Sequence, residues 1–223
     1  MSIVLALAAI LADPSFVTIK VATTQGQTRS LRHETSFSIE KVRFIYRSAT
    51  KEEHLSGSEG KFFYKTSLTE GVLIVPGSRI PLTAPEVTLA ISLRGEPLKS
   101  EGEDPSAFRL RRLTSVPLPV GPTKIGDSWQ ITYLPDGAAV PEVRFTCKLL
   151  AVEKLLGIDS AKIAVTVREA LPGEASASYT AWVDLASGLL IRSKADLKKA
   201  LIAGSVVDAT WSMALNTTAS PKL

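Results

Sequence analysis

The sequence has little of the side-chain chemistry on which metal sites and disulfide-stapled folds depend. Its 223 residues include one cysteine, Cys147, and two histidines, His33 and His54. A single cysteine cannot form a disulfide within the chain, and the cysteine and histidine clusters that bind zinc are missing. Stability must therefore come from packing, for which a chain of this length with 45% hydrophobic residues is sufficient.

Recognisable catalytic motifs are also missing. The chain has no Gly-x-Ser-x-Gly nucleophile elbow and no glycine-rich phosphate loop that leads into a helix. Both histidines lie in polar stretches, RSLRHETS and KEEHLSGS, and we interpret them as surface-loop residues. Asp127 follows a glycine, where an aspartate usually closes a turn through its own carboxylate. We therefore predict a non-enzymatic protein with no catalytic residue, no cofactor and no metal ligand.

The excess of positive charge is small, since 26 Lys and Arg stand against 22 Asp and Glu. Proteins that bind nucleic acids usually gather basic residues on one face and add aromatic side chains for stacking, whereas aromatic residues make up only 6% here. We expect no nucleic-acid partner. The densest basic clusters, at 108–113 and 192–199, are interpreted as solvated faces, with contact to anionic lipid or polysaccharide as the alternative.

An apolar run, IVLALAAILA, occupies residues 3–12. It is too short to span a membrane and is typical of the central region of a signal peptide. We interpret residues 1–12 as a signal peptide, either complete or truncated at its start, since no Lys or Arg precedes the run. A buried first strand or helix is the alternative. No later run is long enough for a spanning helix, and no cysteine follows to receive a lipid. The mature chain is expected in the periplasm or outside the cell.

Alternation of apolar and polar residues predicts strands along most of the remaining chain. The predicted strands are 16–22, 36–48 with a bulge or bend, 61–68, 71–77, 87–93, 129–133, 143–154, 161–170, 176–185, 189–197 and 205–216. Polar segments at 23–34 and 96–105 separate some of them and are expected to be loops. The last strand is expected to close the sheet.

One short helix is predicted over 105–113, because Asp104 can cap it and Pro105 fits its first position. The segment 193–204 fits a helix or a strand, and the alternation of its charged residues favours a strand. The fold class is therefore mainly β: a curved antiparallel sheet, as a half-barrel or sandwich, with one short helix. We expect a single domain over 13–216, with a sub-division near 115–125 that is rich in Pro and Gly, and a tail over 217–223.

The stretch VPLPVGPTKIGDSW, from Val116 to Trp129, resembles a turn in uncharacterised exported bacterial β-rich proteins. In those proteins the turn precedes two hairpins, the second with an Asp and a Gly in its turn, as Asp184 and Gly188 are here. They are similar to the lipoprotein-carrier half-barrels, in which a curved sheet wraps around a helix and leaves an apolar concavity. The resemblance covers the C-terminal half and implies no catalytic residues.

The first hypothesis is a binding or structural module of the cell envelope for a lipid, another apolar ligand or an envelope protein. A hydrolase that uses Glu101, Glu103 and Asp104 is the alternative from another class, and recruitment of a partner by edge-strand pairing is a third. If the sheet forms a half-barrel, its concave side should include the larger side chains of the C-terminal strands, namely Trp129, Tyr133, Phe145, Tyr179 and Trp211. Alternation places Cys147 on the same face as Phe145, as a small buried residue.

Overall fold

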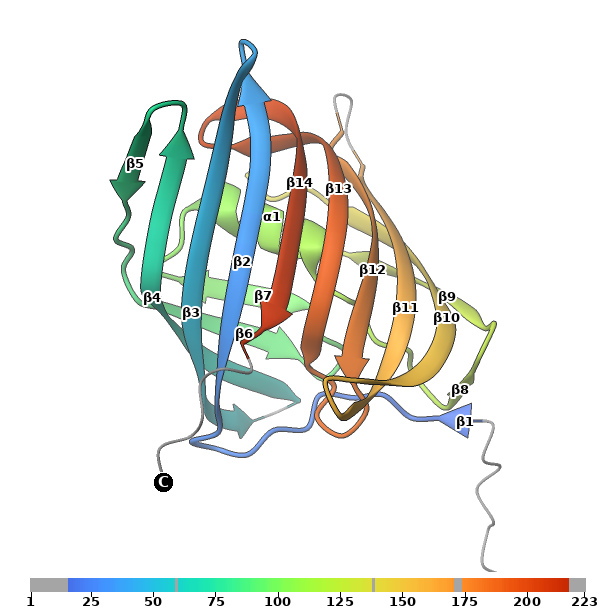
Figure 1. The fold of residues 1–223 in the computed structure, drawn as a ribbon. Helices are drawn as coiled ribbons and strands as arrows, with labels where there is room; N and C mark the ends of the chain where they lie inside the picture. The colour runs from blue at the N-terminus through green and yellow to red at the C-terminus, as the bar shows by residue number, and fades with distance from the viewer. Residues whose placement is uncertain (1–15, 59, 138, 171–173, 217–223) are drawn as a thin grey trace, which may run out of the picture.

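A computed structural model describes residues 16–58, 60–137, 139–170 and 174–216 (Figure 1). The predicted signal peptide and the tail at 217–223 lie outside these residues. The first seven elements are β1 (Phe16–Val17), β2 (Thr28–Ile39), β3 (Val42–Ser58), β4 (Lys61–Val75), β5 (Ser78–Pro81), β6 (Val87–Ser92) and β7 (Pro97–Glu101). The others are α1 (Pro105–Thr114), β8 (Thr123–Lys124), β9 (Ser128–Tyr133), β10 (Val143–Leu155), β11 (Ile158–Glu169), β12 (Ser176–Asp184), β13 (Leu190–Ile202) and β14 (Ser205–Leu215).

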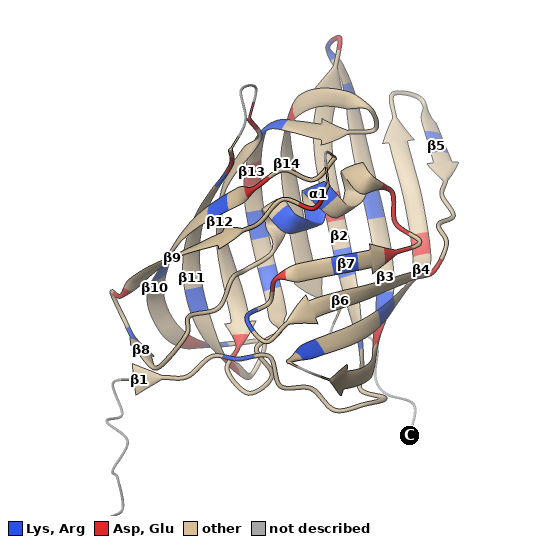
Figure 2. Ribbon diagram, turned by 180° about the vertical axis from the view of Figure 1, so that it is seen from behind, with Lys and Arg blue, Asp and Glu red and all other residues tan. Residues whose placement is uncertain are grey.

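Twelve of these strands form one antiparallel sheet in the order β7-β6-β4-β3-β2-β14-β13-β12-β11-β10-β9, with β5 paired to β4. The sheet curls so that its edges come to lie behind its centre, and α1 lies on the concave side (Figures 1 and 2). Within the described residues the edge strands β7 and β9 do not pair with each other, so the sheet stays open. The predicted fold class, mainly β with a curved antiparallel sheet and one short helix, is confirmed.

Strand β14 does not close the sheet, contrary to the expectation from the sequence. It pairs with β13 on one side and with β2 on the other, so it lies in the middle of the strand order. Because β2 is the first long strand of the chain, this pairing joins the N-terminal and C-terminal halves through backbone hydrogen bonds. The proline-rich segment near 115–125 connects elements of the same sheet.

Four predictions for the N-terminal half are wrong. The polar stretch 23–34 is mostly strand β2, and the expected bulge in 36–48 is a hairpin turn at Glu40 and Lys41, whose φ angles of 50° and 69° fit a tight turn of the type that joins twisted strands. Residues 61–75 form one continuous strand, β4, with an irregular register. The expected loop 96–105 contains edge strand β7.

Helix α1 begins as predicted, because the Asp104 carboxylate accepts a hydrogen bond from the Ser106 amide at 2.8 Å. The helix packs against β7, β12 and β13. Phe108 and Leu113 are buried, at 6% and 1% exposure, and belong to two separate clusters of core residues. The helix therefore fills part of the hollow of the curled sheet.

In each long C-terminal strand, the residues on one face are mostly buried in the core. On β10 the buried residues are Val143, Phe145, Cys147 and Leu149, whereas Arg144 and Lys148 point outward. Cys147 is buried, as predicted, and burial raises the pKa of its thiol to about 12. The segment 193–202 belongs to strand β13, which confirms the preference for a strand.

The segment from residue 18 to residue 24, here called the N-terminal strap, crosses one end of the curled sheet (Figure 1). The predicted strand 16–22 is thus wrong beyond Val17, where β1 ends after pairing with β8. The Val21 amide donates to the Leu93 carbonyl at 3.1 Å, and the Ala22 amide donates to the Ser187 carbonyl at 2.9 Å. The apolar side chains of Ile19 and Val21 are both 2% exposed. The strap therefore covers one end of the core.

Candidate functional site

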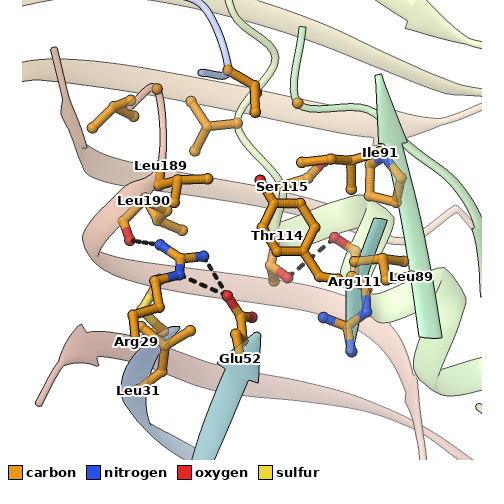
Figure 3. A pocket seen from close by; sticks show the side chains of 18 of the residues that line it. Arg29, Leu31, Glu52, Leu89, Ile91, Arg111, Thr114, Ser115, Leu189 and Leu190 are labelled. Carbon is orange, nitrogen blue, oxygen red and sulfur yellow. Dashed lines mark hydrogen bonds and ion pairs between the residues drawn. The ribbon is translucent and has the colours of Figure 1, made fainter. Parts of the chain in front are cut away.

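A cavity of about 140 Å³ lies between α1 and the concave face of the sheet (Figure 3). Its wall is formed by the helix end, the N-terminal strap and eight strands, namely β2, β3, β4, β6, β7, β12, β13 and β14. Most of the wall is apolar, and its apolar side chains include Val21, Leu31, Leu89, Ile91, Val116, Val183, Leu189, Leu190, Trp211 and Met213. The hollow of the sheet is therefore mostly filled, and only a small part of it stays open.

One wall of the cavity carries an ion pair between Arg29 on β2 and Glu52 on β3 (Figure 3). The two residues are register partners, and the guanidinium lies 2.6 Å from the carboxylate, with side chains 20% and 12% exposed. Arg29 also donates to the Leu190 carbonyl at 2.8 Å. Burial alone would raise the pKa of Glu52, but the charge and hydrogen bond of Arg29 outweigh it and lower that pKa.

His33 lines the same cavity from strand β2, so its interpretation as a loop residue is wrong. Its Nε2 lies 3.2 Å from the Thr50 hydroxyl, and its ring centroid is 6.2 Å from that of Trp211. Burial lowers the pKa of His33 to about 4; Glu52 opposes this shift, and the positive charges of Arg111 and Arg29 add to it. His33 is therefore neutral at pH 7.

His54, also predicted in a surface loop, is a core residue of β3 at 3% exposure. Its ring packs between Phe62 and Tyr64, with centroid separations of 5.5 and 5.1 Å. Neither ring nitrogen has a hydrogen-bond partner among the described residues. A hollow of about 10 Å³ beside His54, Tyr64 and Glu52 has the volume of roughly one water molecule, which would satisfy the ring.

The arginines of α1 do not form the solvated face predicted for residues 108–113. Arg109 pairs with Glu169 on β11, and Arg111 pairs with Glu103 at 2.7 Å. Arg112 is 2% exposed, and its guanidinium donates to the Leu134 carbonyl at 2.6 Å. These three side chains fix the helix in the hollow and are not free to bind an external ligand.

The five aromatic residues predicted for the concave side have different surroundings in the structure. Tyr133 and Phe145 pack against each other in the core, with ring centroids 4.6 Å apart, and Tyr179 donates its hydroxyl to the Ser115 carbonyl. Trp129 is partly buried and donates its indole N–H to the Pro117 carbonyl at 3.0 Å. Among these five, Trp211 alone lines the cavity. The other four fill space or hold the segment that follows α1.

The three carboxylates of the hydrolase hypothesis have separate structural contacts. Glu101 pairs with Lys99 at 2.8 Å, Glu103 pairs with Arg111, and Asp104 caps α1. Such fixed partners give these residues no free carboxylate pair for acid and base catalysis. Asp127 accepts a hydrogen bond from the Lys124 amide at 3.1 Å and closes a turn, as predicted.

Within the described ranges, no group of three or more His, Cys, Asp or Glu side chains is arranged to hold a metal ion. The same part of the chain contains no helix with the length and hydrophobicity needed to cross a membrane.

Sequence reasoning missed Arg29 and Glu52 and misplaced His33, which are three of the polar residues of the cavity wall. Arg29, Leu31 and His33 alternate with exposed or outward residues along β2, so the two-residue period was present. Half of the inward positions of β2 carry polar residues, so the strand does not show the alternation of apolar and polar residues that predicts a half-buried strand.

Comparisons with known proteins give similarity to solved structures alone. No protein-family model matches the chain. No curated protein matches it. Among solved structures it is similar to a Bacteroides fragilis protein with a YmcC-like fold that is predicted to be exported, at 7% identity over 89% of this chain and 97% of that chain, with a TM-score of 0.34.

Proposed function

We propose that this protein is a non-enzymatic, exported binding module of the cell envelope that holds a small apolar molecule, or the apolar end of a larger one, in the cavity under α1. The observation that carries the proposal is the cavity itself, about 140 Å³ in volume and lined mainly by apolar side chains from the sheet, the helix end and the N-terminal strap. Close-packed protein interiors contain few voids larger than a water molecule, so an apolar cavity of this size is a candidate binding site.

The volume sets the size of the ligand. Pockets for drug-sized molecules usually measure about 300–1,000 Å³, whereas an apolar protein cavity of about 150 Å³ binds benzene. We therefore expect a single ring or a short chain rather than a whole lipid. The Arg29–Glu52 pair leaves no unpaired charge on that wall, so the bound part should be uncharged, with at most one hydrogen-bonding group facing His33 or Thr114.

Export is supported by the apolar run at residues 3–12. The hydrolase alternative is less well supported, because each of its three carboxylates has a structural contact. The periplasm or the cell exterior is the location that fits the proposal.

Ligand-induced thermal stabilisation tests the proposal. A ligand that binds only the native state raises the melting temperature with its concentration. Purified protein would be scanned with benzene, indole and linear alcohols of increasing length. We expect stabilisation by the ring compounds and by the shorter alcohols, and a loss of the effect beyond the length that the cavity admits.

Two variants assign the binding to the cavity. Leu189→Trp places an indole in the cavity wall and should abolish the stabilisation, whereas Val206→Trp adds the same group at a position that is 65% exposed and should leave it intact. The proposal is wrong if no compound stabilises the wild type, or if Leu189→Trp folds and still responds like Val206→Trp.

A further inference from the structure

The outer face of the sheet carries a groove of about 950 Å³, on the side opposite to the cavity. It lies over β4, β3, β2, β14 and β13, whose outer faces turn toward the viewer in Figure 1 with α1 behind them. Part of its lining consists of small residues that point outward from these strands, including Ala49, Ser212 and Ala214. Larger apolar residues, among them Leu155 and Leu156 at the end of the β10–β11 hairpin, also line it.

The walls of the groove are mainly basic. Five positively charged residues line it, against two acidic ones, Glu34 and Glu70; the basic residues are Arg32, Arg47, Arg79, Arg192 and Lys194. All five are exposed. Only Arg47 is paired, with Glu34 at 2.7 Å. The other four have no carboxylate within 4.0 Å in the described part of the chain, so their charges face solvent.

Strand register sets the spacing of these charges. Ala214 on β14 is the register partner of Arg192 on β13 and of Arg32 on β2. Strands β13 and β2 are therefore separated by one strand and lie about 10 Å apart. Lys194 follows Arg192 by two residues on the same face, about 7 Å along the strand. Arg192 also lies over the ring of Trp182 at 5.8 Å, which limits its freedom to move. The cations therefore form a spaced array on a rigid surface.

We propose that this outer groove binds an extended anionic polysaccharide, whose repeating acidic groups pair with Arg32, Arg192 and Lys194. Guanidinium groups bind carboxylate and phosphate oxygens with two parallel hydrogen bonds, and an array of them suits a polymer with regularly spaced charges. The proposal concerns a site separate from the cavity under α1, and it does not depend on the ligand of that cavity.

Other anionic partners fit the groove less well. Protein interfaces centre on a buried aromatic or apolar anchor. The lining here has no Phe, Tyr or Trp side chain, and its larger apolar residues stand among five basic ones; they include Val72, Leu155, Leu156 and Leu215. A bilayer presents a flat surface, whereas this face is hollowed. Single-stranded nucleic acids stack their bases on aromatic side chains, and the lining contains no Phe, Tyr or Trp.

Titration of the full chain with polygalacturonate, with neutral dextran as the reference, tests the proposal. We expect saturable binding of polygalacturonate that added salt weakens, and no binding of dextran. The variant Arg32→Gln/Arg192→Gln/Lys194→Gln should bind at least tenfold more weakly. A matched variant, Lys41→Gln/Lys61→Gln/Lys124→Gln, removes the same charge from exposed lysines outside the groove and should bind within twofold of the wild type.

Thermal unfolding of both triple variants must match that of the wild type. If the first one is unfolded, the double variant Arg32→Gln/Lys194→Gln, which keeps the contact between Arg192 and Trp182, takes its place. The proposal is overturned if the wild type does not bind polygalacturonate or if both triple variants lose affinity equally. Tighter binding of poly-glutamate or of phosphatidylglycerol vesicles would overturn it in favour of an acidic protein segment or a membrane.

Discussion

The Arg109 guanidinium on α1 and the Glu169 carboxylate at the end of β11 form two parallel hydrogen bonds. The Arg109 Nε lies 2.5 Å from one carboxylate oxygen, and the second amine binds the other. Glu169 is 1% exposed and also accepts from the Ala175 amide at 3.1 Å. A buried carboxylate thus depends on this arginine for its counter-charge, and the helix depends on it for its position.

Replacement of Arg109 by alanine should therefore be strongly destabilising. The loss of one partner leaves the Glu169 charge buried without compensation, which typically costs about 3–5 kcal/mol. Chemical denaturation of Arg109→Ala measures this loss. Arg144→Ala is the control, because Arg144 pairs with Glu142 at the surface with its side chain 70% exposed, and such pairs contribute at most about 1 kcal/mol. Equal losses in the two variants would contradict the role assigned to Arg109.

The sequence predicted the C-terminal half of the fold better than the N-terminal half. Strands β10 to β14 alternate between buried and more exposed residues over most of their length, so their pattern predicted their approximate extent and their inner face. Strand β2 reads TRSLRHETSFSI, with a polar residue at several inner positions, and was predicted in part as a loop. The polar residues fit inside because Glu52 neutralises Arg29 across the strand pair.

The cavity was beyond sequence analysis for a related reason. Its wall combines residues of eight strands, the helix end and the strap, and the pairing of β14 with β2 brings the N-terminal and C-terminal strands among them together. Alternation shows which face of a strand is buried, but it does not show which strand lies beside it. Trp211 could be assigned to the inner face, whereas its position at a void followed only from the topology.

Replacement of Trp211 by alanine tests the packing around the cavity. The ring is partly buried and contacts His33, so we expect a loss of about 3 kcal/mol, the lower end for a buried aromatic side chain. The enlarged cavity should also admit longer alcohols in the thermal-shift assay. Trp182→Ala is the comparison, because that ring lies on the outer face between Lys162 and Arg192. Trp182→Ala should lower the free energy of unfolding by about 1 kcal/mol and leave the range of bound alcohols unchanged. A larger loss of stability in Trp182→Ala than in Trp211→Ala would contradict the position of Trp211 at the cavity.

The lowered pKa of His33 predicts how stability depends on pH. In the unfolded chain the imidazole takes up a proton near pH 6.5, whereas in the folded chain the pKa is about 4. The unfolded state therefore binds more protons between these values, and stability falls as the pH falls from 6.5 to 4. A shift of this size corresponds to at most about 3 kcal/mol.

Denaturation of the wild type and of His33→Gln at pH values from 7 to 4 measures this contribution. The wild type should lose more stability than the variant over that range, with the difference approaching about 3 kcal/mol at pH 4. Glu52 acts in a lower window, because the stability that comes from its lowered pKa is lost below its ordinary value of 4.5. Parallel pH profiles for the two proteins from pH 6.5 to 4 would show that His33 titrates normally in the folded state.

The last prediction concerns Gly188, where two separate features of the structure require a glycine. Its φ of 67° lies in the left-handed region, and a Cβ at this position would overlap the Lys20 carbonyl of the N-terminal strap. Gly157, in the turn between β10 and β11, has a similar φ of 81°, but a Cβ added there would meet no described atom within 4 Å. The two glycines thus separate backbone strain from contact with the strap.

Gly157→Ala should cost about 1–2 kcal/mol, which is the strain of a left-handed alanine. Gly188→Ala should cost more and should also displace the strap, because the new methyl group and the Lys20 carbonyl cannot occupy the same space. Lys20 is exposed, so limited trypsin digestion reports the displacement by cleavage after this residue. We expect cleavage there to be faster in Gly188→Ala than in the wild type and in Gly157→Ala. Since Val21 lines the cavity, the same variant should exchange bound ligand faster, and equal cleavage rates in the two variants would mean that Gly188 does not hold the strap in place.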